Sequence, residues 1–150
     1  MAKKKFITIL PGSVEVHLHK DMGMIPFIIG SYKNWESSYA YLECDGTPIE
    51  NKEFEKNCKL ICIGKRTNDW HINRKLIINF IKQHIIEYDV VNFYNYGGHI
   101  WEWAYYCKKY NPKIIIWSKL DMGMGGTSIS VKIIFCEKLK IILKDLNPNM

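Results

Sequence analysis

Two patterns of apolar and polar positions alternate along the chain, and each predicts one kind of element. Short apolar runs rich in strand-forming residues predict strands at 5–10, 59–63, 89–95 and 113–120. Residues 37–43 alternate with period two, which predicts a half-buried strand, whereas the continuous run 59–63 predicts a strand covered on both faces. Helical spacing of apolar residues predicts helices at 20–32, 73–88, 99–110 and 131–146.

The alternation of strands and helices predicts the fold class. Apolar strands that alternate with amphipathic helices indicate βαβ units and a mostly parallel sheet flanked by helices. We therefore expect residues 1–150 to form a single α/β, Rossmann-like domain. Ligands of such sheets bind at the carboxyl ends of the strands, which makes the loops at 11–21, 94–99 and 121–128 the places to look for a site.

The net charge of the chain limits the classes of ligand or partner that it favours. The 150 residues carry a formal net charge of +6, which suits nucleic acid, anionic lipid or a phosphorylated ligand. The excess is diffuse, however, because 3–5 is the only run of three basic residues and Arg66 and Arg74 are the only arginines. Specific nucleic-acid binding leans on arginine, so a solvated basic surface is the favoured interpretation.

The cysteines and the apolar runs indicate a compartment. Five cysteines with irregular spacing follow no secretory signal, so we expect reduced, buried thiols and no metal site. No apolar run is long enough to span a bilayer. These features predict a cytoplasmic protein.

The loop at 11–21, between the first predicted strand and the first predicted helix, carries a cluster of polar residues. His17 and His19 occupy alternate positions, which places them on the same side of an extended segment, and Lys20 and Asp21 follow. The cluster either faces a polar substrate or consists of solvated histidines with Asp21 as a helix cap. A metal pair would need a further ligand that the sequence does not identify.

The second and third loops are rich in glycine. Gly97 and Gly98 permit a ligand to approach the backbone, and His99 then starts a helix, where it either takes a proton from a hydroxyl or caps the helix in water. Asp121 leads into residues 122–130, which match no phosphate-loop motif and favour a flexible connection over phosphate binding. There is no nucleophile elbow, so a hydrolase finds no support.

Two stretches of the sequence resemble a known family. The pattern H-x-x-K-D-x-G-x-I-P is carried by His17, Lys20, Asp21, Gly23, Ile25 and Pro26, and a strand ends in K-L-D at 119–121. With the order of elements, these residues resemble the N-terminal, acceptor-side half of bacterial family 4 glycosyltransferases, which have the GT-B architecture of two Rossmann-like domains.

The resemblance implies an activity and a set of site residues. It implies a metal-independent transferase of the hexosyltransferase class that uses a nucleotide sugar as substrate and no cofactor. His99 would be catalytic, and the substrate-binding residues would be His17, Lys20, Asp21, Gly23, Gly97, Gly98 and Asp121. The E-x7-E hallmark of the C-terminal, donor-binding domain is absent, so we expect the chain to be incomplete or inactive alone.

The resemblance also implies partners. These are a nucleotide sugar, a glycan or lipid-linked acceptor, and a missing C-terminal domain or partner chain. A separate hypothesis is peripheral attachment to the inner face of the membrane through basic and aromatic residues. The alternative is a non-catalytic α/β binding module for a phosphorylated ligand or a partner protein, which would use the same loops at the strand ends.

Overall fold

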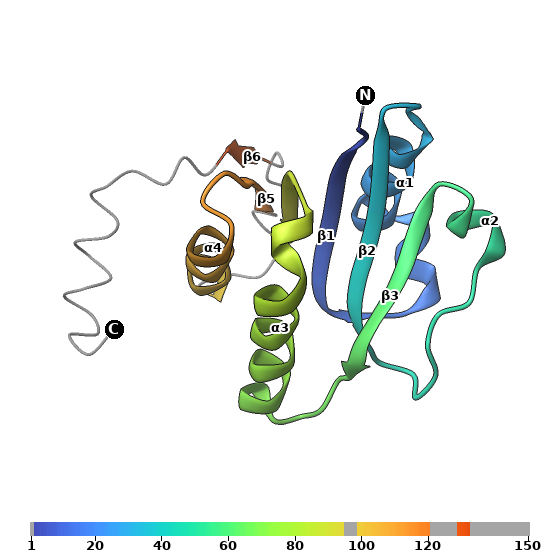
Figure 1. Ribbon diagram of the computed structural model, residues 1–150. Helices are drawn as coiled ribbons and strands as arrows, with labels where there is room; N and C mark the ends of the chain where they lie inside the picture. The colour runs from blue at the N-terminus through green and yellow to red at the C-terminus, as the bar shows by residue number, and fades with distance from the viewer. Residues whose placement is uncertain (1, 95–98, 121–128, 133–150) are drawn as a thin grey trace.

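The computed structural model describes residues 2–94, 99–120 and 129–132, and its elements alternate as the sequence predicts (Figure 1). The strands are β1 (Lys4–Ser13), β2 (Trp35–Glu43), β3 (Cys58–Lys65), β4 (Val90–Tyr94), β5 (Ile115–Leu120) and β6 (Ile129–Lys132). The α-helices are α1 (Asp21–Ser31), α2 (Lys52–Glu55), α3 (Trp70–His84) and α4 (His99–Tyr110). Two 3-10 helices are η1 (Glu15–His19) and η2 (Ile85–Glu87).

The strands form one six-stranded sheet in the order β3-β2-β1-β4-β5-β6. The pairs β1–β2, β2–β3, β1–β4 and β4–β5 are parallel, and only the β5–β6 pair is antiparallel. The predicted α/β fold with a mostly parallel sheet is confirmed. Because the chain runs outward from β1 to β3 and then returns to β4, the order reverses between β1 and β4, which is where open sheets of this type leave a crevice.

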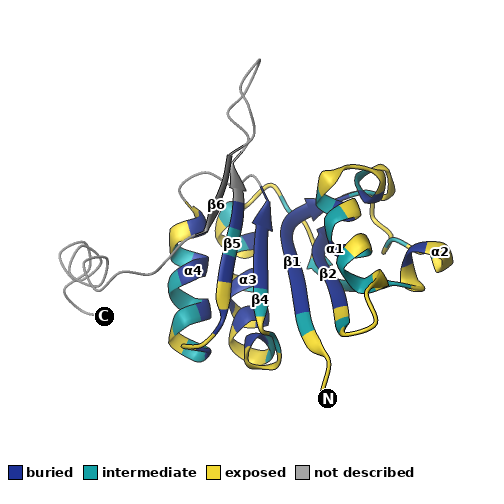
Figure 2. Cartoon of the chain, turned by 90° about the horizontal axis from the view of Figure 1, so that it is seen from above, coloured by how far each residue is buried: buried dark blue, intermediate teal, exposed yellow. Residues whose placement is uncertain are grey.

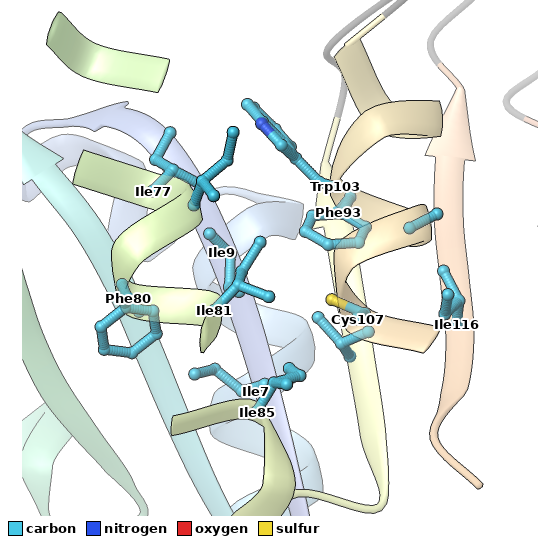
Figure 3. Close-up of a cluster of buried hydrophobic side chains, with 14 of the residues drawn as sticks. Ile7, Ile9, Ile77, Phe80, Ile81, Ile85, Phe93, Trp103, Cys107 and Ile116 are labelled. Atoms are coloured by element: carbon cyan, nitrogen blue, oxygen red, sulfur yellow. The ribbon is translucent and has the colours of Figure 1, made fainter. Parts of the chain in front are cut away.

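One face of the sheet is covered by α3 and α4. Ile7 and Ile9 of β1 point to this face and meet Ile77 and Ile81 of α3 and Trp103 of α4 in a fully buried cluster (Figure 3). Each large side chain removed from water in this way stabilises the fold by about 1.5–3 kcal/mol. The same cluster fixes the start of α3 at the carboxyl edge of the sheet.

The other face is covered by α1 and α2 over the half of the sheet that contains β2 and β3 (Figure 1). Leu10, Leu18 and Tyr39 form a second buried cluster with Phe54 of α2. Gly23 of α1 lies so close to the backbone of Leu18 that a Cβ atom there would overlap it. The glycine therefore lets η1 pack against α1.

The burial of two strands differs from expectation. Residues 37–43 of β2 are all buried, because β2 is an inner strand covered on both faces, so the prediction of a half-buried strand is wrong (Figure 2). Conversely, β3 was expected to be covered on both faces but is the edge strand, and most of it is only partly buried. Period alone does not reveal a strand's position in the sheet.

The C-terminal prediction also changes. Residues 131 and 132 belong to β6 and not to the helix expected at 131–146, whose remaining residues lie outside the described ranges. No helix among the described residues is both long and apolar enough to cross a bilayer.

Candidate functional site

The carboxyl ends of the parallel strands gather the polar loops at one edge of the sheet, the lower edge in Figure 1. β1 ends at Ser13, β2 at Glu43, β3 at Lys65 and β4 at Tyr94. Two adjacent cavities open here. One is bordered by the loops that precede α1 and α2, and the other by the loop that precedes α3.

The first loop does not adopt the extended form expected of it. Residues Glu15–His19 form η1, so His17 and His19 do not share a side as they would in an extended segment. His19 is exposed, and His17 is partly buried and turns back toward Ser13. The expectation that alternate positions place the two imidazoles on one side is wrong, because a helical turn and not an extended segment carries them.

His17 belongs to a small polar network at the end of β1. Its Nδ1 accepts a hydrogen bond from the Val14 N–H at 3.3 Å and lies 3.4 Å from the Ser13 hydroxyl. The Ser13 and Tyr39 hydroxyls share a hydrogen bond of 2.7 Å in the buried interior. Burial and the charge of Lys20 lower the pKa of His17, and Asp45 opposes them only in part. The imidazole is therefore neutral at pH 7.

The other predicted residues of the first loop have separate surroundings. Lys20 and Asp21 are exposed, and Asp21 Oδ2 accepts a hydrogen bond of 3.5 Å from the Tyr94 hydroxyl at the end of β4. Gly23 is buried and is needed for packing against Leu18. The structure thus brings His17 near the cavity edge and gives Gly23 a structural reason to be glycine.

The first cavity is acidic, and we name it the acidic cavity. It encloses about 500 Å³ and is lined by Ser13, Val14, Glu15, Asp45, Thr47, Pro48, Ile49 and Glu50. Three of these side chains are carboxylates, and none of the described lining residues is lysine or arginine. This charge is opposite to the +6 of the whole chain.

A sharp turn shapes the far wall of the acidic cavity. Gly46 has a φ of 84°, which favours glycine, and its N–H donates a 2.6 Å hydrogen bond to Glu43. The Tyr41 hydroxyl accepts a 2.7 Å hydrogen bond from the Ile49 N–H. These two contacts tie the loop at 45–50 to the buried strand β2 and hold Asp45 at the cavity.

The second cavity contains a cation, and we name it the arginine cavity. It encloses about 420 Å³ and is lined by Cys44, Arg66, Thr67, Asn68, Trp70 and Asn73. Arg66 reaches from the end of β3 across β2 to the end of β1, where a Cβ on Gly12 would lie 2.8 Å from its guanidinium and 3.1 Å from the Cys44 sulfur. The absence of a side chain at Gly12 is what leaves room for the guanidinium.

His99, the predicted catalytic residue, lies beside the arginine cavity. It is the exposed first residue of α4, and its ring packs on Trp70 with centroids 4.3 Å apart. It is thus separated from His17, which lies at the other cavity. Its catalytic role remains a prediction, and Gly97, Gly98, Asp121 and the loop at 122–128 lie outside the described residues.

Sequence reasoning missed the residues that give the two cavities their charge. Nothing in the sequence distinguishes Glu15, Asp45 and Glu50 from ordinary solvated acidic residues, or Arg66 from a solvated basic residue. The available signal was position, since Asp45 and Arg66 each follow a predicted strand by only a few residues.

The cysteines split into two groups. Cys58 and Cys107 are buried as expected, and burial raises the pKa of the Cys58 thiol to about 12. Cys44 and Cys62 are exposed, so the expectation of burial is wrong for them, and Cys136 lies outside the described residues. Within the described ranges no group of three or more histidine, cysteine, aspartate or glutamate residues is arranged to hold a metal ion.

Comparison with known proteins supports the fold alone. No family model matches the chain, and no curated protein does. Among solved structures, the C-terminal domain of a hydrogenase from Pyrococcus furiosus matches with a TM-score of 0.51. The two chains are 16% identical, and the match covers 79% of this chain and 92% of that domain. At this identity the likeness concerns the α/β architecture.

These comparisons overturn the resemblance to glycosyltransferases. No glycosyltransferase family model or curated protein matches, and the solved structure that does match is a domain of a hydrogenase. The inferred acceptor-binding half of a GT-B transferase is therefore wrong. One of its motif residues, Gly23, has a local explanation in its packing against Leu18. The Rossmann-like sheet is the part of that expectation that stands.

The alternative, a binding module for a phosphorylated ligand or a partner protein, gains no support either. The matched solved structure does not point to it. The described helix starts at this edge also disfavour a phosphate, because Asp21 lies in the first turn of α1 and the Asp69 carboxylate caps α3 by accepting from the His71 N–H.

Proposed function

We propose that this domain binds a short aliphatic diamine or polyamine in the acidic cavity. The observation that carries the proposal is the charge of the lining. Glu15, Asp45 and Glu50 border one cavity, and no lysine or arginine is among its described lining residues. Carboxylates lining a concave site favour a cationic ligand and raise its local concentration.

The spacing of the carboxylates favours an extended organic cation over a single metal ion. Although three carboxylates border the cavity, no described group of such ligands converges closely enough to hold a metal. Val14, Pro48 and Ile49 supply apolar surface between the charges. A chain of methylenes with an ammonium group at each end matches that alternation of apolar and charged surface.

The neutral imidazole of His17 helps to keep the cavity acidic. His17 contacts Ser13 at the cavity wall, and its lowered pKa leaves it uncharged at pH 7. A protonated histidine at this position would cancel part of the field of the neighbouring Asp45. Because the three carboxylates are exposed, water screens them, and each contact is worth about 0.5–1 kcal/mol.

Calorimetric titration with putrescine tests the proposal. We expect saturable heat with a dissociation constant on the order of 10 mM, because three screened charge contacts supply only a few kcal/mol, and weaker binding as salt is added. Neutral butanediol, which has the same carbon chain, should give no saturable heat. Absence of saturable putrescine binding would refute the function.

Charge-removal variants locate the binding. Glu15→Gln, Asp45→Asn and Glu50→Gln should each weaken putrescine binding by roughly three- to five-fold, and the triple variant should abolish it. Glu36→Gln is the matched control, because it removes the same charge at the amino end of β2, where Glu36 pairs with Lys3 at 4.0 Å. Equal loss in the Glu36→Gln protein would show that putrescine responds only to net charge.

A further inference from the structure

The two arginines of the chain have opposite surroundings. Arg74 of α3 donates from Nε at 2.7 Å and from a second guanidinium nitrogen to the Glu102 carboxylate of α4, so its charge is neutralised within the fold. Arg66 makes no ion pair with any described residue, and the hydrogen bond that its guanidinium donates within the described chain goes to the Cys44 sulfur at 3.9 Å. One arginine joins two helices, whereas the other lines a cavity.

We propose that the arginine cavity binds a small aromatic monocarboxylate, with Arg66 paired to the carboxylate and Trp70 against the ring. This site is separate from the acidic cavity and does not depend on diamine binding there. A guanidinium presents parallel N–H donors that match both oxygens of a carboxylate.

The support around Arg66 is rigid. The Arg66 N–H donates to the Glu43 carbonyl at 2.9 Å, which holds the residue against the end of β2. Asn73, buried in the first turns of α3, then fixes the next residue of the loop. It accepts from the Thr67 N–H at 2.8 Å and donates to the Thr67 carbonyl at 2.7 Å. The cavity is therefore formed before any ligand arrives, which lowers the entropic cost of binding.

The aromatic part of the ligand is inferred from Trp70. This indole lines the cavity and is packed against the His99 ring, with Trp103 beyond it at a centroid distance of 6.1 Å. A tryptophan held in this way offers a fixed planar surface, on which another ring packs in an offset or tilted arrangement. Such a surface favours a flat aromatic acid over an aliphatic one.

The charge balance favours a carboxylate over a phosphate. Arg66 is the only cation among the described lining residues, and the acidic side chain of Asp69 occupies the nearby start of α3. A single positive charge matches a monoanion, whereas a phosphate dianion would face the Asp69 carboxylate without a second cation.

Nuclear magnetic resonance of the five tryptophan indole N–H groups tests the inference on the full chain, with benzoate as the probe. The indole signal of Trp70, assigned by its loss in Trp70→Phe, should shift saturably with benzoate. Benzamide, which has the ring without the charge, and inorganic phosphate should not shift it. No saturable shift with benzoate, or an equal or larger shift with phosphate, would overturn the assignment.

Three variants separate recognition by the guanidinium from general attraction. Arg66→Gln should weaken benzoate binding at least ten-fold, about 1.4 kcal/mol, and Arg66→Lys should weaken it less because the charge remains without the paired donors. Lys65→Gln, the charge-matched neighbour, should leave affinity within about two-fold. The other indole signals should stay in place in all three, which reports intact folding. An Arg66→Gln protein that binds benzoate like the wild type would refute the proposal.

Discussion

The acidic cavity and the arginine cavity lie at the ends of the same strands yet carry opposite charge. Asp45 borders the acidic cavity, and its chain neighbour Cys44 borders the arginine cavity. At the end of β1, Ser13 borders the acidic cavity, and its neighbour Gly12 lies under the Arg66 side chain. The sheet therefore determines where the cavities form, and the loops determine what each one attracts. The net charge of +6 for the whole chain therefore describes the charge of neither cavity.

The two cavities also differ in how they are supported. The arginine cavity rests on Asn73 and on a helix that packs into the larger buried cluster, whereas the acidic cavity rests on the exposed loop at 45–50, held by Gly46 and Tyr41. We therefore expect substitutions under the first cavity to cost more stability than substitutions under the second. Four variants test this difference, in order of decreasing effect.

Asn73→Ala should have the largest effect. It leaves the Thr67 backbone N–H and carbonyl without their partners in a partly buried setting, which costs about 2 kcal/mol of unfolding free energy. Urea denaturation measures the loss, and benzoate binding should disappear while putrescine binding persists. A cost below about 0.5 kcal/mol with benzoate binding intact would show that Asn73 does not support the cavity.

Gly46→Ala is the corresponding change under the acidic cavity. An alanine at a φ of 84° is strained, so we expect a loss of about 1 kcal/mol, smaller than for Asn73→Ala. The turn that presents Asp45 should shift, and putrescine affinity should fall by a factor of about three while benzoate affinity holds. Unchanged stability would mean that the loop adapts without strain, and unchanged putrescine affinity would remove the turn from the account of the site.

His17→Asn tests the support of the acidic cavity through pH. It removes the titrating imidazole, and Asn keeps an acceptor near the position of Nδ1. Burial holds the folded pKa of His17 below its usual 6.5, so the unfolded chain takes up the proton first as pH falls. The free energy of unfolding is therefore unaffected by this histidine above pH 6.5. It decreases as pH falls from 6.5 through the folded pKa of His17, by at most about 1.4 kcal/mol per pH unit. The wild type should lose stability more steeply than the variant over that range. Parallel pH profiles would contradict the assigned burial.

Gly12→Ala should have the smallest effect on stability and a clear effect on binding. The new Cβ would lie 2.8 Å from the guanidinium nitrogen of Arg66, the far end of a flexible side chain that can move away. We expect a change in unfolding free energy within about 0.5 kcal/mol and a loss of benzoate affinity of about three-fold or more. Full benzoate affinity in this variant would show that the position of Arg66 over Gly12 is not needed.

Much of the fold follows from hydrophobic periodicity alone. The helix expected at 99–110 has those bounds in the structure, because its apolar stripe is continuous and Asn111 and Pro112 end it. The burial of β2 and β3 could not be predicted, because it depends on strand order, which is set by long-range pairing and not by local pattern.

The sequence indicates where in the fold a candidate site lies, but it does not indicate which side chains meet there. The rule that ligands bind at the carboxyl ends of parallel strands directs attention to the loop that follows β1, where His17 and Ser13 interact. It does not reveal that Arg66 crosses β2 to reach Gly12, since that contact joins residues far apart in sequence. The motif around Gly23 was misleading, because a glycine required for close packing looks the same in a sequence as one required by a substrate.

We propose that one sheet edge carries two cavities with independent and opposite ligand preferences. The most direct measurement titrates putrescine and benzoate separately into the wild type, the triple variant of Glu15, Asp45 and Glu50, and Arg66→Gln. The triple variant should lose putrescine binding and keep benzoate binding, and Arg66→Gln should do the reverse. If both variants lost both ligands, or if neither variant lost its own, the assignment of the two cavities would be wrong.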